Sequence, residues 1–235
     1  ATHLLHLAWY TEPRLFWTSA MNLAWLSASL SLVSSFVEGG GRRVVSAGSC
    51  AEYDWKNSGH LLSEQSTPAN PATLYGITKN SLNQVLSSYL NEKDISSAWG
   101  RLFFLYGVGE KPGRFMSTIL QNLREGTQAN LTSGVQRRDF MFTDDAARAF
   151  AELLDSPLCG DVNIGSGIET ALAEVAVSLG RSLNRPELVV LGGLADNPND
   201  PISLVADVQR LREELKFVPA FSLEQGLRAI LESTE

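Results

Sequence analysis

Cysteine, histidine and basic side chains are all scarce in this sequence. Two cysteines, Cys50 and Cys159, occur in 235 residues; they are too few for a disulfide framework, and we expect a reducing, cytoplasmic location. His3 and His6 fall on opposite faces of a strand, so we predict that they pack in the core and hold no metal. The net charge of −7 argues against a nucleic-acid partner, because such binding needs clustered Lys and Arg.

The N-terminal part has neither an initiator methionine nor the basic region of a signal peptide. A long stretch further on contains no charged residue. Leu15 to Val37 holds 23 residues and no charged one, but it contains six serines, Thr18 and Asn22. The length could span a bilayer, yet these polar side chains are expensive in lipid. We therefore predict no membrane span. We expect a helix over 15–37 that is buried on two sides, against a sheet and against another helix.

Strand and helix patterns alternate through the first 106 residues. Short apolar runs predict strands, and apolar positions at helical spacing predict helices. The expected strands cover 2–8, 43–47 and 95–104, and the expected helices cover 15–37 and 72–90. This alternation is typical of parallel crossovers in an α/β sheet.

The pattern changes after Gly107, where a Pro/Gly loop and shorter elements follow. Thr143 reads as a helix N-cap, followed by acidic residues in the first turn. We expect strands near 137–139, 162–164 and 189–191, and helices over 115–125, 143–154, 171–183, 205–215 and 223–231. The chain thus divides into 1–106 and a second part, 107–235, some of whose segments return to the first.

Tyr75, Lys79 and Ser49 are the candidate catalytic residues. Tyr75 and Lys79 lie four residues apart in a predicted helix and so share one face. A nearby ammonium lowers the pKa of a phenol, and such a phenol can exchange a proton with an alcohol or a carbonyl. Ser49 directly follows a predicted strand, at the sheet edge where α/β proteins bind ligands. The three residues predict hydride chemistry between an alcohol and a nicotinamide.

The Tyr-x-x-x-Lys pair alone is a weak signal, because it also describes a core tyrosine beside a solvated lysine. An ordered series of motifs supports the catalytic interpretation. It consists of His6-Leu7-Ala8, Asn22, Val44 to Ser49, Tyr75-Gly76-Ile77-Thr78-Lys79, Arg101-Leu102-Phe103, Tyr106-Gly107, Arg138-Asp139-Phe140, Asp145-Ala146-Ala147, Asn163-Ile164-Gly165 and Ala206-Asp207. On these motifs the chain resembles the extended short-chain dehydrogenase/reductase superfamily, in its nucleotide-sugar epimerase/dehydratase family.

The resemblance implies a Rossmann-like doubly wound parallel sheet over 1–106 and a small C-terminal α/β substrate lobe over most of 107–235. It implies NAD or NADP as cofactor and a nucleotide sugar or keto-sugar as substrate. By resemblance, the catalytic residues are Ser49, Tyr75 and Lys79; the cofactor is bound by Leu7, Ala8, Asn22, Ala47, Tyr75, Lys79 and Phe103; and the substrate is bound by Ser49, Phe104 and Arg138.

Several family features are lacking. No Gly-x-x-Gly-x-x-Gly turn is found, so we expect that the first strands were omitted or truncated. Cys50 and Ala51 stand where the family's dehydratases place Asp-Glu, which disfavours elimination. Phe104 replaces an asparagine that grips phosphate, and residues 197–200 lack the second arginine clamp of many epimerases. These two differences argue against a uridine diphosphate sugar and leave another nucleotide sugar or a keto-sugar as the substrate.

The sequence predicts an epimerase or a ketoreductase that transfers hydride with Tyr75 as acid and base. In the alternative, the chain is a non-catalytic nucleotide-binding or scaffold relative that keeps the fold. The family often pairs subunits through two helices, and the uncharged segment suits that role. We therefore expect a homodimer through the helices at 15–37 and 72–90.

Overall fold

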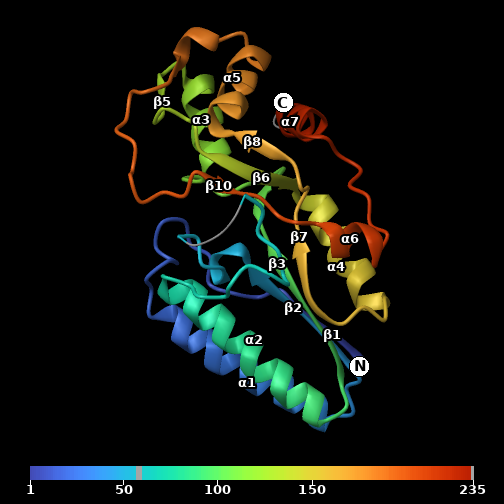
Figure 1. The fold of residues 1–235 in the computed structure, drawn as a ribbon. Helices are drawn as coiled ribbons and strands as arrows, with labels where there is room; N and C mark the ends of the chain where they lie inside the picture. The colour runs from blue at the N-terminus through green and yellow to red at the C-terminus, as the bar shows by residue number, and fades with distance from the viewer. Residues whose placement is uncertain (57–59, 234–235) are drawn as a thin grey trace.

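The computed structural model describes residues 1–56 and 60–233. Its central element is a parallel sheet in the order β1-β2-β3-β7 (Figure 1). The strands are β1 (His3–His6), β2 (Arg43–Ser49), β3 (Ser96–Leu102) and β7 (Gly160–Ile164). The register sets Gly48 opposite Arg101 in the neighbouring strand. All seven residues of β2 are buried, as expected for a strand covered on both faces.

Helices cover both faces of this sheet. Helices α1 (Met21–Glu38) and α2 (Leu74–Glu92) pack side by side on one face. Helices α4 (Thr143–Asp155) and α6 (Gln209–Glu213) cover the other. Parallel strands with helices on both sides confirm the predicted Rossmann-like doubly wound fold.

A second lobe lies beyond the carboxyl ends of these strands (Figure 1). Its mixed sheet has the order β10-β6-β4, with β8 antiparallel to β6, and a separate pair joins β5 to β9. The strands are β4 (Phe104–Tyr106), β5 (Ala129–Asn130), β6 (Arg137–Phe142), β8 (Glu169–Ala171), β9 (Val189–Val190) and β10 (Ser203–Leu204); the helices are α3 (Phe115–Glu125), α5 (Leu172–Ser182) and α7 (Leu223–Glu232).

Three hydrophobic clusters hold these layers together. Val45, Phe150 and Ile164 belong to the cluster between the sheet and α4. A second cluster lies between the sheet and the α1–α2 pair, where Val44 and Trp99 pack. The third fills the lobe. The buried His6 forms a 2.8 Å hydrogen bond between its Nε2 and the Ser29 hydroxyl, so this histidine packs in the core as predicted. The same prediction was wrong for His3, which is exposed at the start of β1, on the outer edge of the sheet.

Two predicted helices begin later than expected. In each case the backbone before the helix is hydrogen-bonded to a side chain or to a neighbouring extended segment. Helix α1 begins at Met21 and not at Leu15. The Asn22 amide donates hydrogen bonds to the carbonyls of Phe16 and Ser19, which fixes the preceding residues as a loop. The helix expected over 205–215 is reduced to α6, because residues 203–207 are extended and pair with β6 and with Leu62.

Two smaller predictions were also wrong. The strand expected over 95–104 divides at Phe103, and Phe104 already belongs to the second sheet. The N-cap of α4 is Phe142 and not Thr143, which is the first helical residue.

The division of the chain at residue 106 stays a prediction. Three later elements, β7, α4 and α6, do return to the first sheet. None of the described helices has the length and apolarity that a membrane crossing requires.

Candidate active site

The end of β2 and the start of α2 meet closely. Ser49 is the last residue of β2, and a one-turn 3-10 helix, η1 (Cys50–Glu52), follows it. Helix α2 begins after Thr73, whose hydroxyl accepts a 3.1 Å hydrogen bond from the Gly76 amide. A Cβ on Gly76 would lie 2.2 Å from the Ala51 carbonyl oxygen, so only glycine permits this approach. The contact places Tyr75 beside Ser49.

Tyr75 lies under an aromatic cover and is 9% exposed. Its ring meets Phe16 and Trp17 edge-on, at 4.9 and 5.8 Å between ring centres. Burial raises the pKa of the phenol above its usual value, while the nearby Ser49 side chain and the charge of Arg114 lower that pKa. Ser49 and Tyr75 are therefore brought together, as the sequence predicted.

Lys79 is buried one turn further along α2, at 3% exposure. Its Nζ donates a 2.7 Å hydrogen bond to the carbonyl oxygen of Ala47 and lies 4.1 Å from the ring centre of Trp9. Burial lowers the pKa of the ammonium to about 7, against the opposing effect of the Glu52 carboxylate. A lysine with this pKa titrates near neutral pH.

The expected lowering of the Tyr75 pKa by Lys79 is not observed. Burial raises the pKa of Tyr75, and the cation that lowers it is Arg114, from the loop before α3. The reason is geometric, because Lys79 Nζ is held by the Ala47 carbonyl and the Trp9 ring. Spacing along a helix predicts a shared face, but not the direction of a long side chain.

The predicted cofactor residues differ in exposure. Leu7 is 47% exposed at the end of β1, and Ala8 is also exposed. Ala47 and Phe103 are buried, and the Ala47 carbonyl accepts from Lys79. Asn22 is fully buried, and it accepts a 2.8 Å hydrogen bond from the Trp9 indole. Asn22 therefore fixes the loop that places Trp9 over Lys79.

The predicted substrate residues gather at the lobe side of the same edge. The Arg138 guanidinium is 5.5 Å from the ring centre of Phe104 and donates a 2.7 Å hydrogen bond to Asp200. Its charge also acts on the thiol of Cys50, next to Ser49. Burial nevertheless raises the pKa of Cys50 to about 12, so this thiol stays protonated at neutral pH.

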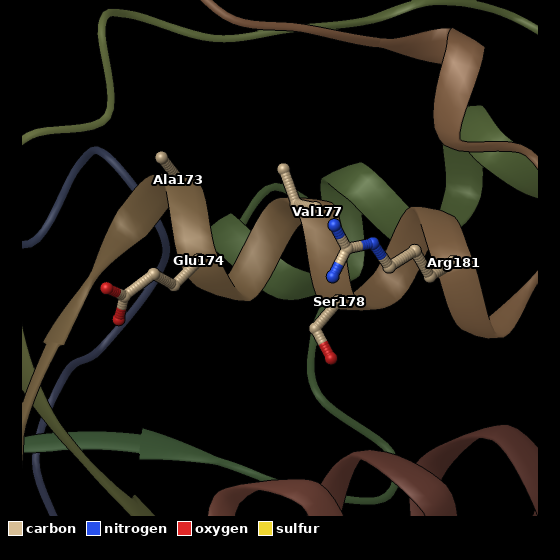
Figure 2. Close-up of a pocket in the computed structure, with 5 residues that line it drawn as sticks. All are labelled: Ala173, Glu174, Val177, Ser178 and Arg181. Atoms are coloured by element: carbon tan, nitrogen blue, oxygen red, sulfur yellow. The ribbon is translucent and has the colours of Figure 1, made fainter.

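Two hollows are found on the lobe, and one of them is near the site. A hollow of about 170 Å³ is lined by Arg14, Arg114 and the first turns of α3. A hollow of about 390 Å³ lies along α5, where Ala173 and Val177 project from one side of the helix and Ser178 from the other (Figure 2). This larger hollow contains no predicted site residue, and only the first belongs to the argument about function.

The sequence reasoning missed the Phe16 and Trp17 cover over Tyr75 and two further residues that touch the catalytic set. Trp9 covers Lys79, and Glu52 accepts a 2.7 Å hydrogen bond from the Ser49 amide. Glu52 had a local signal, because Ser49-x-x-Glu52 has the spacing of a capping box. Trp9 had none, since its contact with Lys79 joins residues 70 positions apart in the chain.

The model of the NAD dependent epimerase/dehydratase family matches residues 1–165 of this chain. The chain belongs to the NAD-dependent epimerase/dehydratase family. The predicted nicotinamide cofactor is confirmed at this level, because the family depends on NAD. The predicted resemblance to nucleotide-sugar enzymes is confirmed by the relatives and structures that match it.

Two curated relatives and one solved structure illustrate the similarity. CDP-abequose synthase of Salmonella typhimurium is 26% identical over 67% of this chain and 54% of its own length. The uncharacterized UDP-glucose epimerase YtcB of Bacillus subtilis is 29% identical over 69% of this chain and 52% of its own. The structure of MoeE5 in complex with UDP-glucose and NAD is 25% identical, with a TM-score of 0.81, over 99% of this chain and 79% of that chain. The chain thus spans about half the length of the curated relatives.

The side chains of the site suit the ribose end of NAD. An ammonium has three N–H donors, and among the described residues Lys79 uses one on the Ala47 carbonyl and faces Trp9. A remaining donor suits a pair of sugar hydroxyls. The exposed Leu7 and Ala8 offer an apolar surface at the adjoining strand end. These residues therefore fit the cofactor on which the family depends.

Proposed function

We propose that the protein is an NAD-dependent nucleotide-sugar epimerase or ketoreductase with Tyr75 as acid and base. One observation carries the proposal: the buried side chains of Ser49 and Tyr75 lie together at the carboxyl end of the central strands, close enough for the serine to lower the pKa of the phenol. Parallel α/β sheets bind ligands at this edge. A phenol held there by a serine can pass a proton to and from a sugar oxygen.

Each residue has a separate task in this proposal. NAD supplies the hydride chemistry when it is bound. Tyr75 takes the proton from a sugar hydroxyl or returns it to a carbonyl, and Ser49 hydrogen-bonds the same oxygen. Lys79 donates to the ribose hydroxyls, while Leu7, Ala8, Asn22, Ala47 and Phe103 form or support the cofactor side. Phe104 and Arg138 face the substrate.

The chemistry of Cys50 favours epimerisation or reduction over elimination. An elimination needs a further acid and base near the sugar. Cys50 follows Ser49 directly, but burial raises the pKa of its thiol to about 12, so it is a poor base at neutral pH. We therefore propose that the protein moves hydride and a proton without expelling water from the sugar.

A panel of nucleotide sugars tests this proposal. The intact protein is incubated with each sugar and with NAD or NADH, and both the sugar products and the absorbance of reduced nicotinamide are followed. Interconversion without net change in absorbance identifies an epimerase, and stoichiometric change identifies a ketoreductase. Dinucleotide binding without turnover of any sugar would contradict the proposal and favour the non-catalytic alternative.

Arg114 is expected to bind the diphosphate of the substrate. It lines the hollow beside α3 together with Arg14, and its charge reaches Tyr75. Within the described residues neither arginine has a salt bridge. Loss of a charge-assisted hydrogen bond in Arg114→Ala should raise KM for the sugar nucleotide about tenfold or more. Steady-state kinetics check this, with Arg228→Ala on α7 as the control; equal KM values in both variants would count against it.

We propose that two copies of the chain form a homodimer through α1 and α2. The exposed side chains of α1 between Ala24 and Ser35 are uncharged, and Val85 lies 50% exposed on α2. Buried together, two such helix pairs would form a four-helix bundle. We expect Ala28→Arg/Val85→Arg to convert a dimer to a monomer in sedimentation, whereas Val218→Arg, at an exposed loop, leaves the mass unchanged. A wild-type monomer at micromolar concentration would contradict this.

A further inference from the structure

A buried carboxylate lies directly beneath Ser49. Glu52 is the last residue of η1 and is 0% exposed. Its Oε1 accepts a 2.7 Å hydrogen bond from the backbone amide of Ser49. From β3, the Trp99 indole donates to both oxygens at 3.1 and 3.0 Å, and Arg101 Nε donates to Oε2 at 3.0 Å. The carboxylate therefore connects the turn that presents Ser49 to β3.

Gly48 provides the space in which the Glu52 carboxylate meets the Trp99 indole. A Cβ on Gly48 would lie 2.1 Å from the Trp99 indole nitrogen and 2.6 Å from Glu52 Oε1. Any other residue would therefore push the carboxylate and the indole apart. Gly48 thus allows the polar contact to form against the strand itself.

The network continues through Arg101 and returns to the catalytic helix. Arg101 Nη2 pairs with the Asp161 carboxylate on β7 at 2.8 Å. The other Asp161 oxygen accepts a 2.9 Å hydrogen bond from the Asn83 amide on α2. Asn83 lies one turn beyond Lys79 on that helix. A continuous polar path therefore joins the turn that carries Ser49 to the helix that carries Tyr75 and Lys79.

The ion pair with Arg101 offsets part of the cost of burying Glu52, and burial still raises the pKa of its carboxyl group. An isolated buried carboxylate is costly, whereas one with a cation and several donors is tolerated. The charge of Glu52 also reaches the catalytic pair, because it raises the pKa of Lys79 against the effect of burial. The ionisable groups that face Glu52 are Arg101 from β3, Lys79 and Tyr75 from α2, and Cys50 from its own turn, with Asp161 of β7 beyond Arg101.

We propose that Glu52 is a positioning residue for the proton transfer. Its carboxylate fixes the turn after β2 so that the Ser49 hydroxyl meets the Tyr75 hydroxyl, and the path through Arg101 and Asp161 keeps that turn in register with α2. This inference rests on the proposed function of Ser49 and Tyr75. It assigns to Glu52 an effect on turnover, beyond an effect on folding.

The variant Glu52→Gln tests the assignment. The glutamine oxygen can still accept from Ser49, but its amide hydrogens then face the donors of Trp99 and Arg101. We expect kcat to fall at least about tenfold, while KM for NAD and for the sugar stays within about threefold. Because the charge of Glu52 raises the pKa of Lys79, the pH profile of kcat should also shift toward lower pH. Glu152→Gln is the matched control and should have wild-type kinetics, because the Glu152 carboxylate pairs with Arg148 on the surface of α4.

A second readout does not depend on activity. The Ser49 amide hydrogen should exchange with solvent at least about tenfold faster in Glu52→Gln, because it loses a charged acceptor. If that variant does not fold, Trp99→Phe removes one donor from Glu52 and should show the same changes at smaller size. Lower thermal stability with wild-type kcat, pH profile and Ser49 exchange would overturn the proposal.

The two hypotheses fail in different ways. Wild-type turnover in Tyr75→Phe would refute the proposed function, whatever Glu52 does. Loss of turnover in Tyr75→Phe, together with wild-type kcat and Ser49 exchange in Glu52→Gln, would refute the role of Glu52 alone.

Discussion

Replacing Tyr75 with phenylalanine is expected to lower kcat about 1,000-fold, within the range that general acid–base groups contribute. The ring keeps its edge contacts with Phe16 and Trp17, so the fold and the cover over the site should persist. Only the hydroxyl that meets Ser49 is lost. The rate of sugar interconversion and the dissociation constant of NAD, measured by quenching of tryptophan fluorescence, provide the test, and the dissociation constant should change little.

Tyr89→Phe is the matched control for this variant. Tyr89 lies on the same helix α2, half-buried and away from Ser49. Its phenylalanine variant should retain the wild-type rate. A rate in Tyr75→Phe within about tenfold of the wild type would contradict the role of the phenol, because that loss is below what a proton-transfer group supplies.

Replacing Lys79 with methionine should abolish turnover and stabilise the protein at low pH. The ammonium is buried, and burial lowers its pKa to about 7 from the ordinary 10.5. Methionine has a similar length and no charge to desolvate. A functional group that costs stability is common in active sites, and its removal often stabilises the fold.

The sign of the pH dependence follows from proton binding. Below pH 7 Lys79 is charged in both the folded and the unfolded states, and the cost of burying it is constant. Between pH 7 and 10.5 the unfolded chain binds more protons, so the wild type gains stability as the pH rises. The advantage of Lys79→Met should therefore be largest at pH 6. It should shrink by about 3 kcal/mol by pH 9, which lies two pH units above the folded pKa.

Urea unfolding at pH 6 and pH 9 measures this difference. Lys93→Met is the control, because Lys93 is exposed at the end of α2. The control should follow the wild type at both pH values. Parallel stability curves for Lys79→Met and the wild type would show that Lys79 keeps its ordinary pKa in the folded protein.

Much of the fold follows from local patterns. The strands at β1, β2 and β3 were predicted from apolar runs, and the rule for strand ends placed Ser49 at the ligand edge. The errors arise where distant residues decide the backbone. The Asn22 side chain holds a loop where the pattern predicted a helix, and pairing with β6 and Leu62 extends residues 203–207.

The site shows the same division. Ser49 and Tyr75 were predicted together because both follow short-range rules about strand ends and helix starts. The pKa of Tyr75 was predicted in the wrong direction, because a spacing argument contains neither burial nor the charge of Arg114. Glu52 was missed as a partner of Ser49, although its hydrogen bond to the amide obeys a known N-cap spacing.

The most direct test of the account is a crystal structure of the intact protein with NAD and the nucleotide sugar that it converts. The account predicts the Tyr75 hydroxyl within about 3 Å of the sugar oxygen that changes oxidation state, with Ser49 bonded to that same oxygen. A complex in which another side chain holds that oxygen, while Tyr75 remains sealed beneath Phe16 and Trp17, would contradict it.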